Sequence, residues 1–150
     1  MLDLVYENHT NYHALEEEYF RDIFDILIEH FKMSDEQVEI GLQIVEADKM
    51  RELNNQYRNK DISTDVLSFP LDESNLKKYG IIALGDIFLC PSYVEQKSKE
   101  LGIEFKEEIA RDIIHGFLHL SGYDHEVSDE SEKEMITLQE NILKLVTNHK

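Results

Sequence analysis

The sequence predicts an α+β fold, in which a small mixed β-sheet of about four strands packs against about five helices. Short stretches of alternating apolar residues are interspersed with longer stretches in which apolar residues recur every three or four positions. The two kinds do not alternate regularly, as they would in a parallel α/β sheet. The 150-residue chain has only two prolines, no internal repeat and no Pro/Gly/Ser-rich linker, so we expect one domain over residues 1–150.

The first part of the chain predicts two strands, each followed by a helix. Apolar residues alternate with polar ones over residues 2–6, which indicates a first strand. From residue 15 to residue 31 they recur at three- and four-residue steps, as on one face of a long helix. Alternation resumes over residues 38–45 and indicates a half-buried strand, and we expect a second helix over about residues 48–57.

The second part predicts two strands followed by three helices. Residues 65–69 and 81–89 are short apolar stretches bounded by polar residues, proline or glycine, and we expect them to be strands that can pair as a hairpin. A proline suits the first turn of a helix over residues 91–102. Periodic apolar residues then predict a long helix over residues 104–121, and a C-terminal helix that begins after Ser128.

The charge balance of the chain limits its choice of partners. Fifteen Lys and Arg residues against 32 Asp and Glu residues give a formal net charge of −17. This charge disfavours loose, charge-driven binding to nucleic acid or anionic lipid. One short segment, residues 48–60, has four basic residues against two acidic ones, so a polyanion would have to be held locally.

The sequence also indicates a reducing compartment. Cys90 is the single cysteine, so the chain cannot form an intramolecular disulfide. The N-terminus carries acidic residues where a signal peptide needs basic ones, and no apolar run approaches the roughly 18 residues of a membrane span. We therefore expect a cytoplasmic protein with no membrane partner.

Three histidines, His115, His119 and His125, form a candidate metal site. The first two are four residues apart in a predicted helix, which places their Cβ atoms on one face about 5–6 Å apart. Gly122 can adopt a positive φ and end the helix, so that His125 can return to the same ion. Three imidazoles leave the fourth position of a tetrahedral zinc open for water, as in a catalytic site. Such a site discriminates poorly among divalent metals, so we expect one zinc per chain with nickel as an alternative.

The histidine spacing also resembles the long metzincin pattern H-E-x-x-H-x-x-G-x-x-H. Position 116 is glycine, where a metalloprotease has the glutamate that acts as general base on the metal-bound water. Peptide hydrolysis by that route is therefore disfavoured.

A pair of basic residues, Arg58 and Lys60, precedes the third predicted strand. A planar guanidinium can bind a phosphate in bidentate fashion, and it stays charged at every accessible pH. An open metal position and a local cation suit the hydrolysis of an anionic ester. In this hypothesis zinc activates a water or orients the phosphate as a Lewis acid, while Arg58 stabilises charge on the phosphoryl oxygens. Lys60 helps to hold the phosphate-containing substrate.

These blocks together resemble the YbeY family of bacterial endoribonucleases and rRNA maturation factors. The family signature H-G-x-L-H-L-x-G-Y-D-H is matched over residues 115–125, and the block L-N-x-x-[YF]-R-x-K-D-x-x-T-D-V-L-S-F-P over residues 53–70. Residues 84–87, L-G-D-I, are similar to a strand of the family. The resemblance spans the chain in length and order.

The resemblance implies that His115, His119 and His125 are zinc ligands and that Arg58 is the active-site arginine. It implies a small mixed sheet packed against helices, with the metal at the base of a groove. The implied activity is metal-dependent cleavage of single-stranded RNA, in maturation of the 3′ end of small-subunit rRNA and in ribosome quality control. The expected partners are therefore single-stranded RNA, rRNA and the small ribosomal subunit with its proteins, and no DNA.

Two other classes of function stay open from the residues alone. One is a zinc hydrolase that acts on peptides or small amides, which the metzincin-like spacing favours. The other is a non-catalytic module with a structural metal, because the acidic flanks over residues 13–36 and 126–150 could suit basic ribosomal proteins. An open coordination position argues against a structural metal.

Overall fold

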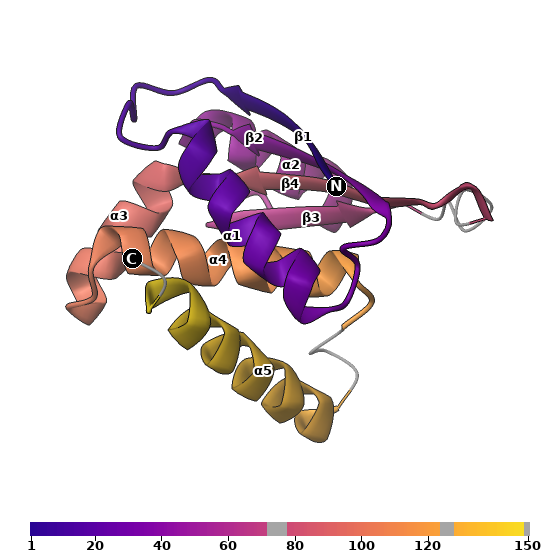
Figure 1. The fold of residues 1–150 in the computed structure, drawn as a ribbon. Helices are drawn as coiled ribbons and strands as arrows, with labels where there is room; N and C mark the ends of the chain where they lie inside the picture. Colours follow the sequence, from indigo (N-terminus) through magenta and orange to yellow (C-terminus); the bar gives the residue numbers. More distant parts are fainter. Residues whose placement is uncertain (72–77, 124–127, 149–150) are drawn as a thin grey trace.

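The computed structural model describes residues 1–71, 78–123 and 128–148 (Figure 1). In these residues the elements have the order and the types that the sequence predicts. They are β1 (Leu2–Asn8), α1 (Glu17–His30), β2 (Gln37–Ile44), α2 (Ala47–Arg58), β3 (Val66–Pro70), β4 (Ile81–Leu89), α3 (Pro91–Leu101), α4 (Phe105–Leu120) and α5 (Asp129–Thr147). No helix in the described ranges is long and apolar enough to cross a membrane.

The strands form one mixed sheet in the order β1-β2-β4-β3. β1 and β4 each lie parallel to β2, whereas β3 lies antiparallel to β4. The α+β class and the hairpin pairing of the third and fourth strands are thus confirmed. Because β3 pairs with β4 on one side only, its other side is an edge of the sheet.

A glycine permits the close pairing of β3 and β4. The register between β2 and β4 shifts between Glu39 and Ile40, which marks a bulge in the sheet. At this point Gly85 has a φ of 133°, and a Cβ there would lie 2.2 Å from the carbonyl oxygen of Phe69. A side chain at this position would therefore force the two strands apart.

Helices cover both faces of the sheet (Figure 1). The main core lies between the sheet and the helices α1, α4 and α5, and its largest side chains include Phe20, Phe24 and Phe117, each 0% exposed. Burying a side chain of this size contributes about 1.5–3 kcal/mol. A smaller cluster joins α2 to the strands and to the start of α3. Its buried members are Val45, Met50, Leu53, Leu67 and Cys90.

The first helix is shorter than the apolar pattern indicates. Leu15 precedes α1, and Phe31 is its C-cap. Leu15 is still buried, and its carbonyl oxygen accepts a 2.6 Å hydrogen bond from the hydroxyl of Tyr6. Residues that flank a helix can pack on the same core as the helix, so periodicity alone did not locate the boundary.

Candidate active site

The helix α4 brings together the first two predicted metal ligands. The Nε2 atoms of His115 and His119 are 3.0 Å apart, and both side chains are half-buried. Two nitrogens that bind one tetrahedral ion at about 2.0–2.1 Å would lie about 3.3 Å from each other. The donor pair therefore fits a shared divalent metal.

The end of α4 is the glycine turn that the sequence predicts. Gly122 has a φ of 101°, its N–H donates to the carbonyl oxygen of His119 at 3.1 Å, and the N–H of Tyr123 donates to that of Leu118 at 3.0 Å. These two bonds form a Schellman motif. His125 lies in residues 124–127, outside the described residues, so its role as third ligand stays a prediction. Within the described part of the chain no three His, Cys, Asp or Glu side chains are placed to hold a metal ion.

Gly116 allows α4 to lie close against the sheet. A Cβ at this position would lie 3.1 Å from Oγ of Ser68 and 3.3 Å from Ile87, tighter than ordinary packing. The Ser68 hydroxyl also donates a 3.2 Å hydrogen bond to the carbonyl oxygen of Gly116. A side chain at position 116 would therefore point into the sheet. This explains in physical terms why glycine stands where metalloproteases have their catalytic glutamate.

The end of α2 positions the predicted phosphate-binding residues. Arg58 is the last residue of the helix, and the C-cap Asn59 has a left-handed φ of 56° that turns the chain toward Lys60. Buried Asn54 then holds the following loop, because its side-chain amide donates a 2.9 Å bond to the carbonyl oxygen of Ile62. Hydrogen bonds to Asn54 thus fix the path of the chain that carries Lys60 away from the helix.

Arg58 and Lys60 differ from another base in the same segment. Arg51 is held by Asp61 through two hydrogen bonds of 2.8 and 3.1 Å. In residues 1–71, 78–123 and 128–148 no carboxylate forms an ion pair with Arg58 or Lys60, and both line a groove. Their positive charge is therefore open to an anion in that groove.

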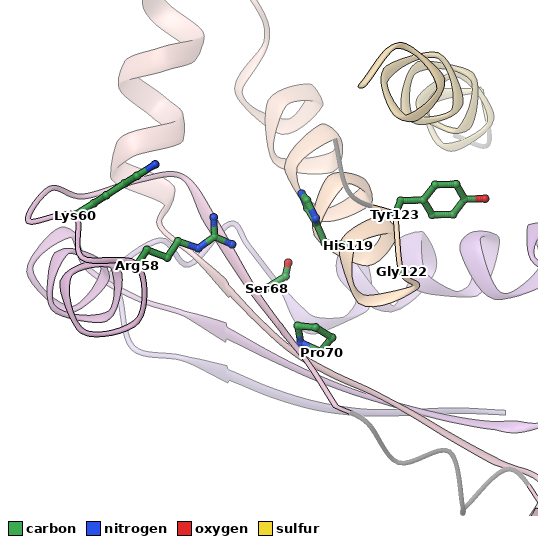
Figure 2. Close-up of a pocket in the computed structure, with 7 residues that line it drawn as sticks. All are labelled: Arg58, Lys60, Ser68, Pro70, His119, Gly122 and Tyr123. Carbon is green, nitrogen blue, oxygen red and sulfur yellow. The ribbon is translucent and has the colours of Figure 1, made fainter. Parts of the chain in front are cut away.

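The groove has two adjoining lobes of about 460 and 410 Å³. Arg58, Lys60, Ser68 and His119 line both lobes. Figure 2 shows the Arg58 guanidinium and the His119 ring directed toward each other from opposite walls, with the Ser68 hydroxyl between them. The second lobe also reaches His115. Segments that are far apart in the sequence thus bring the predicted metal ligands His115 and His119 and the predicted phosphate-binding residues Arg58 and Lys60 to one groove.

Sequence reasoning did not single out Ser68 or Gln139, although both line the second lobe. A signal for Ser68 exists, because alternation along β3 places it on the opposite face from Leu67, which belongs to the cluster under α2. Gln139 lies on α5, and Oε1 of its side chain is 2.8 Å from Nδ1 of His115. No spacing rule links two residues that are 24 positions apart on different helices.

A cluster of charged side chains lines part of the second lobe. Lys97, on α3, lies with its Nζ 2.5 Å from a carboxylate oxygen of Asp65 and 3.2 Å from those of Glu108 and Asp112. Glu108 and Asp112 belong to α4, and their side chains are 4% and 7% exposed. The ammonium of Lys97 on α3 therefore connects the residue that precedes β3 with α4, beside the histidines.

The charges of this cluster are unequal. Burial raises the pKa of Asp112 well above its usual range, and the neighbouring Asp65 raises it further. Burial also raises the pKa of Asp65, but the positive charge of Lys97 outweighs burial and holds the pKa of Asp65 below its usual value. Burial lowers the pKa of Lys97, yet Asp112 and Asp65 together raise it above normal. Lys97 and Asp65 thus form the charged pair, and Asp112 holds a proton more strongly than an ordinary aspartate.

The chain is similar to known endoribonucleases over nearly its whole length. The family model of the endoribonuclease YbeY matches residues 5–147. The endoribonuclease YbeY of Persephonella marina is 35% identical over 136 residues, which are 91% of this chain and 87% of the relative. That of Staphylococcus saprophyticus is 34% identical over 148 residues, with 95% of each chain covered. A solution structure of a Thermotoga maritima protein has a TM-score of 0.66 and 32% identity, over 99% of this chain and 91% of that one. This chain therefore belongs to the YbeY family of endoribonucleases.

Proposed function

We propose that this chain is a metal-dependent endoribonuclease that hydrolyses single-stranded RNA, with residues 1–150 acting as one hydrolase domain. Its proposed task is maturation of the 3′ end of small-subunit rRNA and ribosome quality control in the cytoplasm, with the small subunit and its proteins as partners. The observation that carries the proposal is that Arg58 and His119 face each other across one groove. Membership of an endoribonuclease family supports the class of reaction.

His115 and His119 would hold the metal together with His125, as one zinc per chain with nickel as the alternative. The 3.0 Å separation of the first two Nε2 atoms supports this assignment. A bound zinc supplies a Lewis acid, which lowers the pKa of a water molecule and polarises a phosphoryl oxygen.

Arg58 would bind the scissile phosphate and stabilise the charge that develops on its oxygens. A guanidinium directed into a groove can donate two parallel hydrogen bonds to phosphate, and these bonds strengthen as negative charge grows. Lys60, two residues further on, would hold the strand through a neighbouring phosphate. These two cations act locally, which matters because the net charge of −17 repels RNA at longer range.

The test is cleavage of an end-labelled single-stranded RNA by protein of known zinc content. Arg58→Ala should cut about 10²–10³-fold more slowly, the effect of losing one such donor, and should keep its zinc. His119→Ala should lose both zinc and activity. Arg51→Ala is the matched control. Because Arg51 is bound to Asp61, its replacement should leave the cleavage rate unchanged. Parent-like cleavage by zinc-loaded Arg58→Ala would contradict the role of Arg58.

Two further measurements separate the alternatives. A single-stranded DNA of the same sequence and a set of generic peptides should both stay uncut, and peptide cleavage would favour an amide hydrolase. Removal of the metal should abolish RNA cleavage while the far-UV circular dichroism is retained. Loss of the dichroism together with the activity would instead indicate a structural metal.

A further inference from the structure

We propose that Gln139 fixes the tautomer and the orientation of His115, and so acts as a positioning residue for metal binding. The inference rests on the proposed function for the role of His115 as a ligand. Gln139 lies on α5, is 8% exposed and lines the second lobe of the groove. It reaches His115 on α4 through a 2.8 Å contact between Oε1 and Nδ1.

The two nitrogens of the His115 ring have different neighbours. Nδ1 is bound to Gln139, whereas Nε2 is 3.0 Å from Nε2 of His119. The ring is therefore held at the nitrogen that does not face the other candidate ligand. This leaves Nε2 as the nitrogen placed to share a metal ion with His119.

The orientation of the Gln139 amide follows from its second partner. Nε2 of Gln139 donates a 3.2 Å hydrogen bond to Oε2 of Glu140. A carboxylate can only accept hydrogen bonds, so the amide nitrogen must face Glu140. The reverse orientation would place the amide oxygen against the carboxylate and is excluded by repulsion. Oε1 of Gln139 therefore faces His115.

This orientation determines the tautomer of His115. An amide oxygen can only accept, so Nδ1 of His115 must carry the proton in the 2.8 Å contact. In the neutral ring Nε2 then keeps its lone pair, which a metal ligand needs. Metal-binding histidines commonly donate their other N–H to such an acceptor, and loss of the acceptor typically weakens metal binding by about 10–100-fold.

An arginine anchors the far end of this chain of hydrogen bonds. Nε and Nη2 of Arg111 donate to the two carboxylate oxygens of Glu140 at 3.0 and 3.1 Å. Arg111 also holds the pKa of Glu140 below its usual value, so that Glu140 stays an acceptor. Every bond from Arg111 through Glu140 and Gln139 to His115 consequently has one possible direction.

The position of Gln139 in α5 argues against a purely structural role. It lies on the helix face whose other buried members are apolar, including Met135, Ile142 and Leu143. A leucine would fill such a face without a polar group to satisfy, whereas a buried amide costs about 1–3 kcal/mol unless it is hydrogen-bonded. The contact with His115 accounts for a polar residue at this point.

The experiment compares three forms of the full-length protein in two measurements. Gln139→Leu removes the acceptor at similar size. The exchange Gln139→Glu/Glu140→Gln returns an acceptor to His115 and a donor between positions 139 and 140, and it leaves Arg111 one acceptor oxygen at position 140. Zinc affinity is measured by competition with a chromophoric chelator, and the His115 tautomer by ¹H–¹⁵N NMR of the metal-free protein. Gln96→Leu, which removes an exposed glutamine bound to Glu100, is the matched control.

We expect the parent to hold His115 with its proton on Nδ1, and Gln139→Leu to populate the form protonated on Nε2. Zinc affinity of Gln139→Leu should fall by about 10–100-fold, while the exchange variant restores most of it and Gln96→Leu matches the parent. Parent-like affinity and tautomer in Gln139→Leu would overturn the proposal, even if that variant were less stable. A parent that binds no zinc would contradict the proposed function, whereas the tautomer in the metal-free protein would still decide the role of Gln139.

Discussion

Replacing Lys97 with methionine should destabilise the protein strongly, because this ammonium neutralises a buried group of carboxylates. Three carboxylates, those of Asp65, Glu108 and Asp112, lie within 3.2 Å of its Nζ atom. Methionine keeps the unbranched stem but removes the charge, so Asp65 and the buried Asp112 lose this cation, while Glu108 keeps its contact with Arg111. Removing one partner of a buried ion pair costs about 3–5 kcal/mol. We expect Lys97→Met to lower the free energy of unfolding by about that amount.

The matched control is Lys99→Met on the same helix. Lys99 is 76% exposed at its side chain and pairs with Glu95 at 3.1 Å. An exposed pair of this kind contributes about 0–1 kcal/mol, so the control should stay close to the parent. The assay is urea denaturation of the metal-free protein at neutral pH, followed by circular dichroism. In thermal scans of a protein of this size, a loss of about 3–5 kcal/mol corresponds to a fall in Tm of about 6–20 °C.

Protonation of Asp112 provides an internal check on this reasoning. Its raised pKa means that it takes up a proton before an ordinary aspartate does, so the deficit of Lys97→Met should shrink as the pH falls. The double variant Lys97→Met/Asp112→Asn should recover part of the loss, because the two sites interact directly. The reasoning is refuted if Lys97→Met and Lys99→Met differ by less than about 1 kcal/mol at neutral pH.

Three further predictions concern single positions. Gly116→Glu should lower the Tm, because overpacking against the sheet costs about 1–3 kcal/mol or more, and it should yield no peptidase activity. A stable variant that cuts peptides would contradict the contact between position 116 and the sheet. Gly85→Ala should destabilise the protein far more than Gly80→Ala in urea titrations. Both glycines have a positive φ, but only at Gly85 would a Cβ lie 2.2 Å from a backbone atom, the carbonyl oxygen of Phe69. Equal losses of stability in the two variants would exclude that contact as the cause. The folded-state pKa of Asp112 lies above its usual value of 3.8, so the stability it contributes at low pH is lost as the pH rises through that pKa. Asp112→Asn should therefore gain stability relative to the parent between about pH 4 and neutrality. If the difference between the urea midpoints of the two proteins does not change over this range, the raised pKa is contradicted.

The histidine pair and the turn after it could be predicted because their geometry is local. Residues four apart on a helix share a face, and Gly122 ends α4 at the expected place. The meeting of Arg58 with His119 is not local. It depends on β3 forming an edge of the sheet and on α2 and α4 ending beside that edge, so no spacing rule gives it. Beforehand the two residues were connected by a chemical hypothesis and by the family resemblance, and neither gave their arrangement in space.

The polar partners behind the groove could not be predicted for a different reason. Lys97 and Gln139 lie on helices whose sequences are rich in charged and polar residues, and such residues usually face solvent. The burial of Gln139 and the partial burial of Lys97 arise only when α3 and α5 pack against α4. The element types follow from periodicity, whereas these contacts follow from tertiary packing that periodicity does not specify.

The two sides of the groove are supported by different hydrophobic clusters. His115 and His119 belong to α4, which contributes to the large core, whereas Arg58 ends α2, whose buried residues Met50 and Leu53 belong to the small one. Segments with few buried apolar contacts open at lower free energy than the main core. Backbone amides of α2 should therefore exchange with solvent through local openings that leave α4 closed. If Arg58 holds the phosphate as proposed, this difference would let that side of the groove open locally while the two histidines of α4 keep their arrangement.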